Sequence, residues 1–202
     1  GQKIDRYYHG IGEPYEGIIP PGVDGYDPDL VHQSTVKDVS GAKKLLAENG
    51  WDSKSLPTLE FSSTSSIQKR QMYEQFRAWV GQIGYPKRKI THKTFANFSD
   101  YWKAIKENKL STHELVWNLD YPDAENILQL YYGPNAAPGA NNANYKNPEY
   151  DRLFEKATAM QPGPERTELY KKLNQILIDD CVVIAGFART QVHMWQKDVI
   201  MY

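Results

Sequence analysis

Cysteine is almost missing from this sequence of 202 residues, and the single Cys181 excludes a disulfide within the chain. Cys181 precedes the apolar run Val182-Val-Ile-Ala, and no neighbouring pattern suggests a lowered thiol pKa, so we expect a buried structural thiol. The chain also lacks any run of about 18 apolar residues, so no segment is expected to span a bilayer. Its opening residues do not have the pattern of a signal peptide.

An excess of basic charge is missing as well. Lys and Arg number 24 against 25 Asp and Glu, which gives a net charge of −1 and excludes the basic field that nucleic-acid binding requires. Hydrophobic residues make up 40% and charged residues 24%, as in ordinary globular proteins. The chain is rich in tyrosine and tryptophan, with 14 Tyr and 5 Trp, and both residue types suit cores as well as binding surfaces.

Motifs for metals, nucleotide cofactors and nucleophilic catalysis are absent too. The five histidines (His9, His32, His92, His113 and His193) are scattered, with no pair spaced i and i+4. The acidic loop 24–29 has the wrong spacing for a calcium loop and is interpreted as a turn. Neither GxxxxGK[ST], GxGxxG nor GxSxG occurs. We therefore expect no metal site and no cofactor.

The patterns that are present alternate between strand and helix. Helices are predicted in the first ten residues, around 42–49, over 67–83, around 102–105, after Pro122, around 150–157 and around 169–177. Asp38 or Ser40 can cap the second helix and Ser99 the fourth. Strands are predicted over 58–63 (Leu59 and Phe61 inward), 88–95, 115–119 and 182–187. This order predicts an α/β fold, a mixed sheet with helices on both faces.

One junction singles out Asp120. Residues 115–119 read as a strand covered on both faces, and Pro122 suits the first position of a helix. Asp123 then lies, with Glu125, in the first helical turn, where the helix dipole favours negative charge. Asp120 lies at the carboxyl end of the strand, where ligands bind in open α/β sheets. With aromatic neighbours Trp117 and Tyr121, it could hold a cationic ligand group.

Each of these residues also has a plainer interpretation. Asp120 can be a solvated strand-end residue, and Trp117 can belong to the core. Trp102 lies on an apolar helix face, where a core position is the simpler explanation. An enzyme alternative pairs Asp120 with Asp123 as the two carboxylates of a small hydrolase.

Several segments together resemble the carboxyl-terminal lobe of the family 5 extracellular solute-binding proteins, the dipeptide and oligopeptide receptors of ABC importers. They follow the order of that family and cover nearly the whole chain. They are Ile4–Pro14 with Ile18–Gly22, Ala42–Trp51 (AKKLLAENGW), Trp117–Asp123 (WNLDYPD), Asn144–Leu153 (NYKNPEYDRL) and Arg166–Leu177 (RTELYKKLNQIL). Ala124 departs from the pattern, because the family often has proline there.

The resemblance implies a role for each candidate residue. The acid that pairs with a peptide's α-ammonium group falls on Asp120, and backbone groups at Asn118 would bond the peptide main chain as an added strand does. Trp117, Tyr121 and Trp102 are candidate walls of the cleft. The implied protein binds a peptide or another small solute without catalysis, at the cell exterior or in the periplasm, with or without a lipid anchor. It delivers the ligand to an ABC permease in the membrane; a role in signalling or adhesion is the alternative.

Family members are much longer than this chain. Residues 1–202 are therefore expected to form a single lobe of a two-lobed, periplasmic-binding-protein-like fold, without the amino-terminal lobe. The Gly- and Pro-rich residues 11–37 are long for a loop inside a compact domain, so they either cross a surface or pack against the missing lobe.

Overall fold

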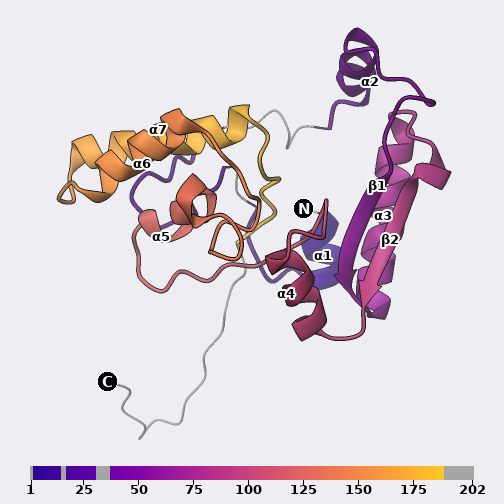
Figure 1. The fold of residues 1–202 in the computed structure, drawn as a ribbon, viewed down its shortest axis with the longest axis horizontal. Coiled ribbons are helices and arrows are strands. Elements are labelled where there is room, and N and C mark those ends of the chain that lie inside the picture. The colour runs from indigo at the N-terminus through magenta and orange to yellow at the C-terminus, as the bar shows by residue number, and fades with distance from the viewer. Residues whose placement is uncertain (1, 15–16, 31–36, 189–202) are drawn as a thin grey trace, which may run out of the picture.

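The computed structural model describes residues 2–14, 17–30 and 37–188 and has the expected α/β class. Its elements are α1 (Gln2–Tyr8), α2 (Val39–Glu48), β1 (Leu59–Thr64), α3 (Ile67–Gln82), η2 (Lys87–Lys89), β2 (Ile90–Phe95), α4 (Phe98–Lys106), α5 (Glu125–Leu128), η3 (Gln129–Tyr131), η4 (Gly133–Asn135), α6 (Pro148–Thr158) and α7 (Pro164–Asp179). Figure 1 shows the sheet with α3 and α4 on one side of the molecule and α5, α6 and α7 on the other. No described helix is both long and apolar enough to cross a membrane.

The described sheet consists of β1 and β2, which run parallel in a register from Leu59 opposite Ile90 to Thr64 opposite Phe95. Side chains alternate between the two faces of a strand. One face carries Phe61, whose ring lies 5.4 Å from that of Phe76 on α3. The opposite face carries Phe95, whose ring lies 5.6 Å from that of Tyr101 on α4. Helices therefore contact both faces, as the sequence predicts.

Burial within β1 differs from the alternation read in the sequence. Leu59 and Phe61 are only half-buried, whereas Ser62 and Ser63 are 0% and 2% exposed. The buried hydroxyl of Ser63 lies 2.9 Å from His92 Nε2 on the neighbouring strand. A strand contacted on both faces buries small polar residues as well, provided that they find hydrogen-bond partners.

The structure confirms one of the two predicted helix caps. Asp38 accepts a hydrogen bond from Gly41 N at the start of α2, as predicted. At the start of α3, for which no cap was predicted, Ser66 accepts one from Lys69 N. In α4 the cap is Asn97, which accepts from Asp100 N, so the assignment of this role to Ser99 was wrong. Both residue types cap helices, and the sequence alone did not distinguish them.

Two predicted strands are not formed. The sheet extends past β1 only as a single parallel bridge between Ser62 and His113, after which residues 114–119 have no regular structure. Residues 182–187 are likewise irregular and end at one antiparallel bridge between Glu13 and Ala188. Val116 and Ile184 are 54% and 79% exposed. An apolar run becomes a strand only where another strand pairs with it, and neither run has such a partner among the described residues.

Cys181 corrects a further expectation, because it is exposed. It follows the last turn of α7 with a φ of +50°, and its N–H donates to Ile178 O at 3.0 Å. The apolar run after it does not form a buried strand, so none of the described residues buries the thiol as the sequence had suggested.

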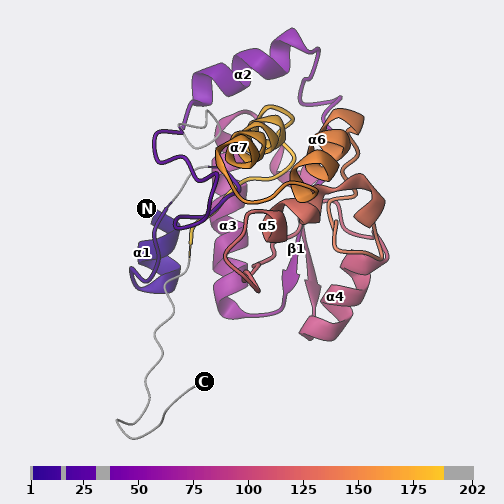
Figure 2. The same cartoon turned by 90° about the vertical axis from the view of Figure 1, so that its left-hand side faces the viewer.

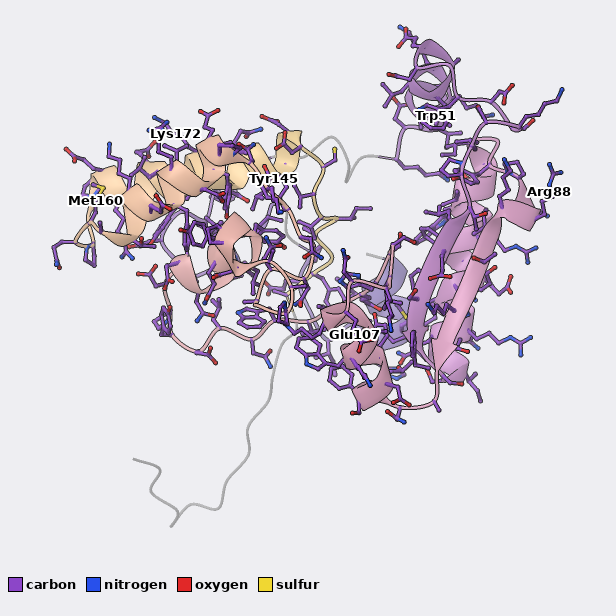
Figure 3. The ribbon with its side chains drawn as sticks, in the orientation of Figure 1. Trp51, Arg88, Glu107, Tyr145, Met160 and Lys172 are labelled. Carbon is purple, nitrogen blue, oxygen red and sulfur yellow. The ribbon has the colours of Figure 1, made fainter. Side chains whose placement is uncertain are left out.

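The helical side of the molecule has its own core. Figure 2 shows α6 and α7 stacked over α5, and the fully buried residues of this core include Tyr150, Leu128 and Leu173. Tyr145, labelled in Figure 3, packs edge-on against Tyr150 with 5.7 Å between the ring centroids.

The described part of the loop after α1 also joins this core. Ile18 and Ile19 are 4% and 0% exposed, and Ile18 N donates to Asn174 Oδ1 on α7 at 2.7 Å. Of the two alternatives for residues 11–37, residues 17–23 therefore follow the first and pack on this chain.

Candidate functional site

The candidate site begins just after His113, which bridges to Ser62 of β1, where the chain leaves the edge of the sheet. Tyr101 of α4 fixes this exit: its hydroxyl accepts from Glu114 N at 3.0 Å and lies 3.0 Å and 3.3 Å from the carbonyl oxygens of Glu114 and Ser62. Lys69 of α3 forms an ion pair of 2.6 Å with the Glu114 carboxylate. Burial raises the pKa of Tyr101 to about 12, so the phenol stays neutral. The segment 115–121 is therefore anchored to the sheet at its start.

Four of the five predicted site residues lie together on this anchored segment. Trp117, Asn118, Asp120 and Tyr121 are all exposed, with Trp117 39% and Tyr121 44% accessible. This exposure contradicts the alternative that Trp117 belongs to the core. Exposed aromatic side chains and a carboxylate on one segment are suited to a ligand with an apolar and a cationic part.

Asp120 has an uncompensated charge in the described part of the chain. It forms no ion pair there, and its carboxylate accepts one weak hydrogen bond, from Asn126 Nδ2 at 3.5 Å. A carboxylate in this situation is available to accept hydrogen bonds from a ligand cation.

Asn126 is a site residue that the sequence analysis missed. It lies on α5 and is 1% exposed, and its Oδ1 accepts from Trp117 Nε1 at 2.9 Å and from Asp120 N at 3.4 Å. In the sequence it is one polar residue inside a helical pattern, and only the folded loop brings it against Trp117 and Asp120.

Asp123 has a different role from Asp120. Arg166 of α7 binds it with two nitrogens, at 2.7 Å and 3.3 Å, and the Tyr170 hydroxyl donates to it at 2.8 Å. It also accepts from Glu125 N at 2.9 Å, in keeping with a place at the start of the helix. α5 itself begins at Glu125, later than the predicted start at Pro122.

The pKa of Asp123 reflects these contacts. Burial raises it, but the Glu125 N–H, Tyr170 and Arg166 together outweigh burial and hold the pKa of Asp123 below its ordinary value. A carboxyl that is ionised and bonded to Arg166 is unsuited to act as a general acid. The pairing of Asp120 with Asp123 as hydrolase carboxylates therefore has no support in this geometry.

Trp102, the fifth predicted residue, lies apart on α4. Its half-buried ring stacks on Phe98 at 6.1 Å and lies 4.4 Å from Lys106 Nζ, which in turn donates to Gly139 O at 2.6 Å. Within the described residues, no hydrogen bond or ring contact joins Trp102 to residues 117–121. Its place in a cleft wall stays a prediction.

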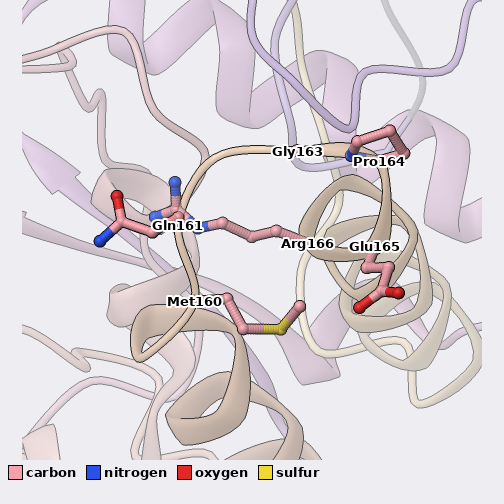
Figure 4. A pocket seen from close by; sticks show the side chains of 6 residues that line it. All are labelled: Met160, Gln161, Gly163, Pro164, Glu165 and Arg166. Carbon is pink, nitrogen blue, oxygen red and sulfur yellow. The ribbon is translucent and has the colours of Figure 1, made fainter.

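A surface depression lies elsewhere, at the turn between α6 and α7. Figure 4 shows its lining residues, which include Met160, Gly163 and Arg166. It lies beside the Arg166 side chain that holds Asp123, and none of the predicted site residues lines it. Among the described residues, no group of three His, Cys, Asp or Glu side chains is placed to hold a metal ion; His32 and His193 lie outside them.

The chain has relatives of known sequence. It is 28% identical over 180 residues to "Heme-binding protein A" of Haemophilus influenzae, with 86% of this chain and 31% of that protein covered. It is 26% identical over 203 residues to "Dipeptide-binding protein" of Escherichia coli, with 98% and 37% covered. The chain thus spans about a third of the length of the curated relatives it matches.

Solved structures share the fold. A periplasmic binding protein associated with an ABC transporter, DppA from Helicobacter pylori in complex with the peptide STSA, superposes with a TM-score of 0.80 at 22% identity. HbpA2 from Haemophilus parasuis gives a TM-score of 0.80 at 23% identity. In both cases 93% of this chain and 36% of the other chain are covered. The fold is thus that of one part of a two-lobed periplasmic binding protein.

The model of the family "Bacterial extracellular solute-binding proteins, family 5 Middle" matches residues 2–139. This match covers β1, β2, α4 and the whole segment that carries Trp117, Asp120 and Asn126. The chain therefore belongs to the family 5 bacterial extracellular solute-binding proteins.

Proposed function

We propose that this chain supplies one wall of the ligand cleft of an ABC-importer receptor that binds peptides or a related small solute without catalysis. The observation that carries the proposal is the exposed Asp120, which has no cationic partner among the described residues and is flanked by Trp117 and Tyr121. Its segment follows the parallel bridge between His113 and Ser62 and therefore starts out towards the carboxyl end of β1, the end at which parallel sheets bind ligands.

The chemistry assigned to each residue follows from its donors and acceptors. Asp120 accepts hydrogen bonds from the α-ammonium group of a peptide, an interaction of about 1.5–3 kcal/mol when water is excluded. The backbone at Asn118, in a segment without regular structure, has N–H and C=O groups available to a peptide main chain. Trp117 and Tyr121 provide apolar walls, and Trp102 extends the wall from α4.

The complete receptor, in this proposal, contains a second lobe that closes over the ligand by a hinge motion. The support is the length of the relatives, of which this chain matches about a third. Residues 1–202 then form a single lobe, and the receptor works in the periplasm or at the cell surface, with or without a lipid anchor. There it delivers its ligand to an ABC permease.

The test uses the full-length protein that contains this chain. Calorimetric titration with a library of di- to pentapeptides is expected to give binding at micromolar or better affinity, and chromatography after incubation is expected to show unchanged peptides. Native mass spectrometry of the purified protein identifies any solute that is retained. Release of peptide fragments would contradict the binding role and favour an enzyme. The failure of every peptide, together with a retained solute of another class, would remove peptides as the ligand.

A further inference from the structure

The segment with Trp117 and Asp120 is exposed and irregular, yet both residues are held by one buried side chain. Asn126 Oδ1 accepts from the Trp117 indole N–H at 2.9 Å and from Asp120 N at 3.4 Å. Its Nδ2 donates to Asp120 Oδ2 at 3.5 Å. A single amide thus links the indole, the backbone and the carboxylate of the candidate site.

The helix turn that carries Asn126 is packed into the helical core. Its neighbours Ala124 and Leu128 are both 0% exposed in the helical core. Asp123, whose carbonyl accepts from Asn126 N at 3.1 Å, is tied to α7 through Arg166. Asn126 therefore connects the packed core to a segment that has no regular secondary structure of its own.

An amide satisfies all three contacts without changing the charge. Its oxygen accepts from two N–H groups and its nitrogen donates to a carboxylate, whereas a carboxylate side chain cannot donate when ionised. A neutral donor orients Asp120 and leaves its full negative charge for a ligand. A lysine or arginine there would orient it too, but would neutralise it.

We propose that Asn126 is the positioning residue of the site, which sets the orientation of Trp117 and Asp120 and thereby the preference for ligands with a free amino group. The part of this proposal that concerns ligands rests on the proposed function. The part that concerns the geometry of Trp117 and Asp120 does not, and the two are measured separately.

The geometry is tested by NMR without ligand, on Asn126→Leu and Asn126→Asp variants of the full-length protein. The Trp117 indole resonance, assigned with Trp117→Phe, is expected to lose its hydrogen-bonded shift and exchange protection in Asn126→Leu. It is expected to keep both in Asn126→Asp, which retains an acceptor. In Asn126→Asp two carboxylates lie side by side, so the pKa of one of them is expected to rise above the ordinary Asp value of about 3.9.

The ligand arm compares trialanine with N-acetyl-trialanine. Asn126→Leu is expected to weaken the binding of trialanine about tenfold more than the binding of the acetylated peptide, because the interaction with the ammonium group depends on the orientation of Asp120. In Asn126→Asp the affinity for trialanine is expected to fall between pH 7 and pH 5 more steeply than in the wild type.

Asn174→Leu is the matched control. Asn174 is also buried, at 3% exposure, but bonds Ile18 N, so its loss is expected to lower stability without moving the Trp117 resonance or the peptide preference. An unchanged indole resonance in Asn126→Leu, or an equal change in the control, would overturn the positioning role. If trialanine does not bind the wild type, the peptide proposal fails for this ligand, while the indole resonance still decides the role of Asn126.

Discussion

Asp120 differs from the other acidic residues of its loop in having a neutral amide as the partner of its carboxylate. In the full-length protein we expect Asp120→Asn to weaken a peptide with a free α-amine more than its N-acetylated form. The expected difference is about 1.5–3 kcal/mol, since a charge-assisted hydrogen bond is lost and the ligand cation is left unpaired. Calorimetric titration of both peptides into both proteins measures it. Equal losses for the two peptides would remove Asp120 from the amine-binding role.

Asp123 gives a prediction about acid stability. Its folded-state pKa lies below the ordinary 3.8, so the unfolded chain takes up the proton first as the pH falls. The stabilisation is therefore complete above about pH 4 and is lost as the pH falls through the lower, folded pKa. Asp123→Asn is expected to lower the free energy of unfolding by about 1–3 kcal/mol at pH 7, and by less at pH 3.

Urea unfolding at the two pH values tests this expectation. Asp179→Asn is the control, because Asp179 is exposed and accepts only from Gln175 in the described structure, so we expect little change at either pH. A loss for Asp123→Asn that is the same at pH 7 and pH 3 would show that the Arg166 pair contributes nothing through charge.

At the scale of elements, Tyr101 connects α4, β1 and the start of the site segment through one hydroxyl. Tyr101→Phe removes the hydroxyl that accepts a hydrogen bond from the Glu114 N–H, and the loss of such a bond costs about 0.5–1.5 kcal/mol. We expect faster hydrogen exchange at the Glu114 amide, measured by NMR or mass spectrometry.

A second tyrosine provides the comparison for that experiment. Tyr73 of α3 is 9% exposed and donates to Ile90 O at 2.8 Å, on the other face of the sheet. Tyr73→Phe is expected to lower stability by a similar amount while Glu114 stays protected. Fast exchange at Glu114 in both variants would mean that the segment responds to global stability and not to Tyr101.

At the scale of the whole molecule, the proposed function gives this chain only one wall of the ligand cleft. We expect residues 1–202 alone to fold, because two apolar clusters are closed within them, around α5 to α7 and around α4. We expect them to bind peptides poorly, since an exposed ion pair contributes only about 0–1 kcal/mol. A receptor with micromolar affinity has roughly 8 kcal/mol of binding free energy. A loss of about 3–4 kcal/mol of this free energy moves the affinity towards the millimolar range.

Calorimetry on the 202-residue chain and on the full-length protein, with the same peptide, makes the comparison. Circular dichroism and thermal unfolding test whether the shorter chain is folded, so that weak binding can be distinguished from misfolding. Micromolar binding by the 202-residue chain alone would show that the site is complete within it and would contradict the two-walled cleft.

The sequence by itself determined the elements whose information is local. Because a helix repeats every 3.6 residues, α3 was predicted close to its observed bounds. For α6 and α7 the same repeat located the central turns, around 150–157 and 169–177, and the observed helices extend beyond them. The strands β1 and β2 were predicted from their local residue patterns as well. The motif around Asp120 was sufficient to place four candidate residues on one segment. Their roles as ligand contacts stay predictions.

The tertiary structure alone decided which apolar runs become strands and which polar residues support the site. Pairing of strands is not local, so residues 115–119 and 182–187 carried strand composition but formed no ladder, and Cys181 is exposed. Asp123 resembled a simple dipole partner until α7 brought Arg166 to it, 43 positions later in the chain. Asn126 gained its role in the same way, because hydrogen bonds of a buried amide depend on which groups the fold places within about 3 Å of it.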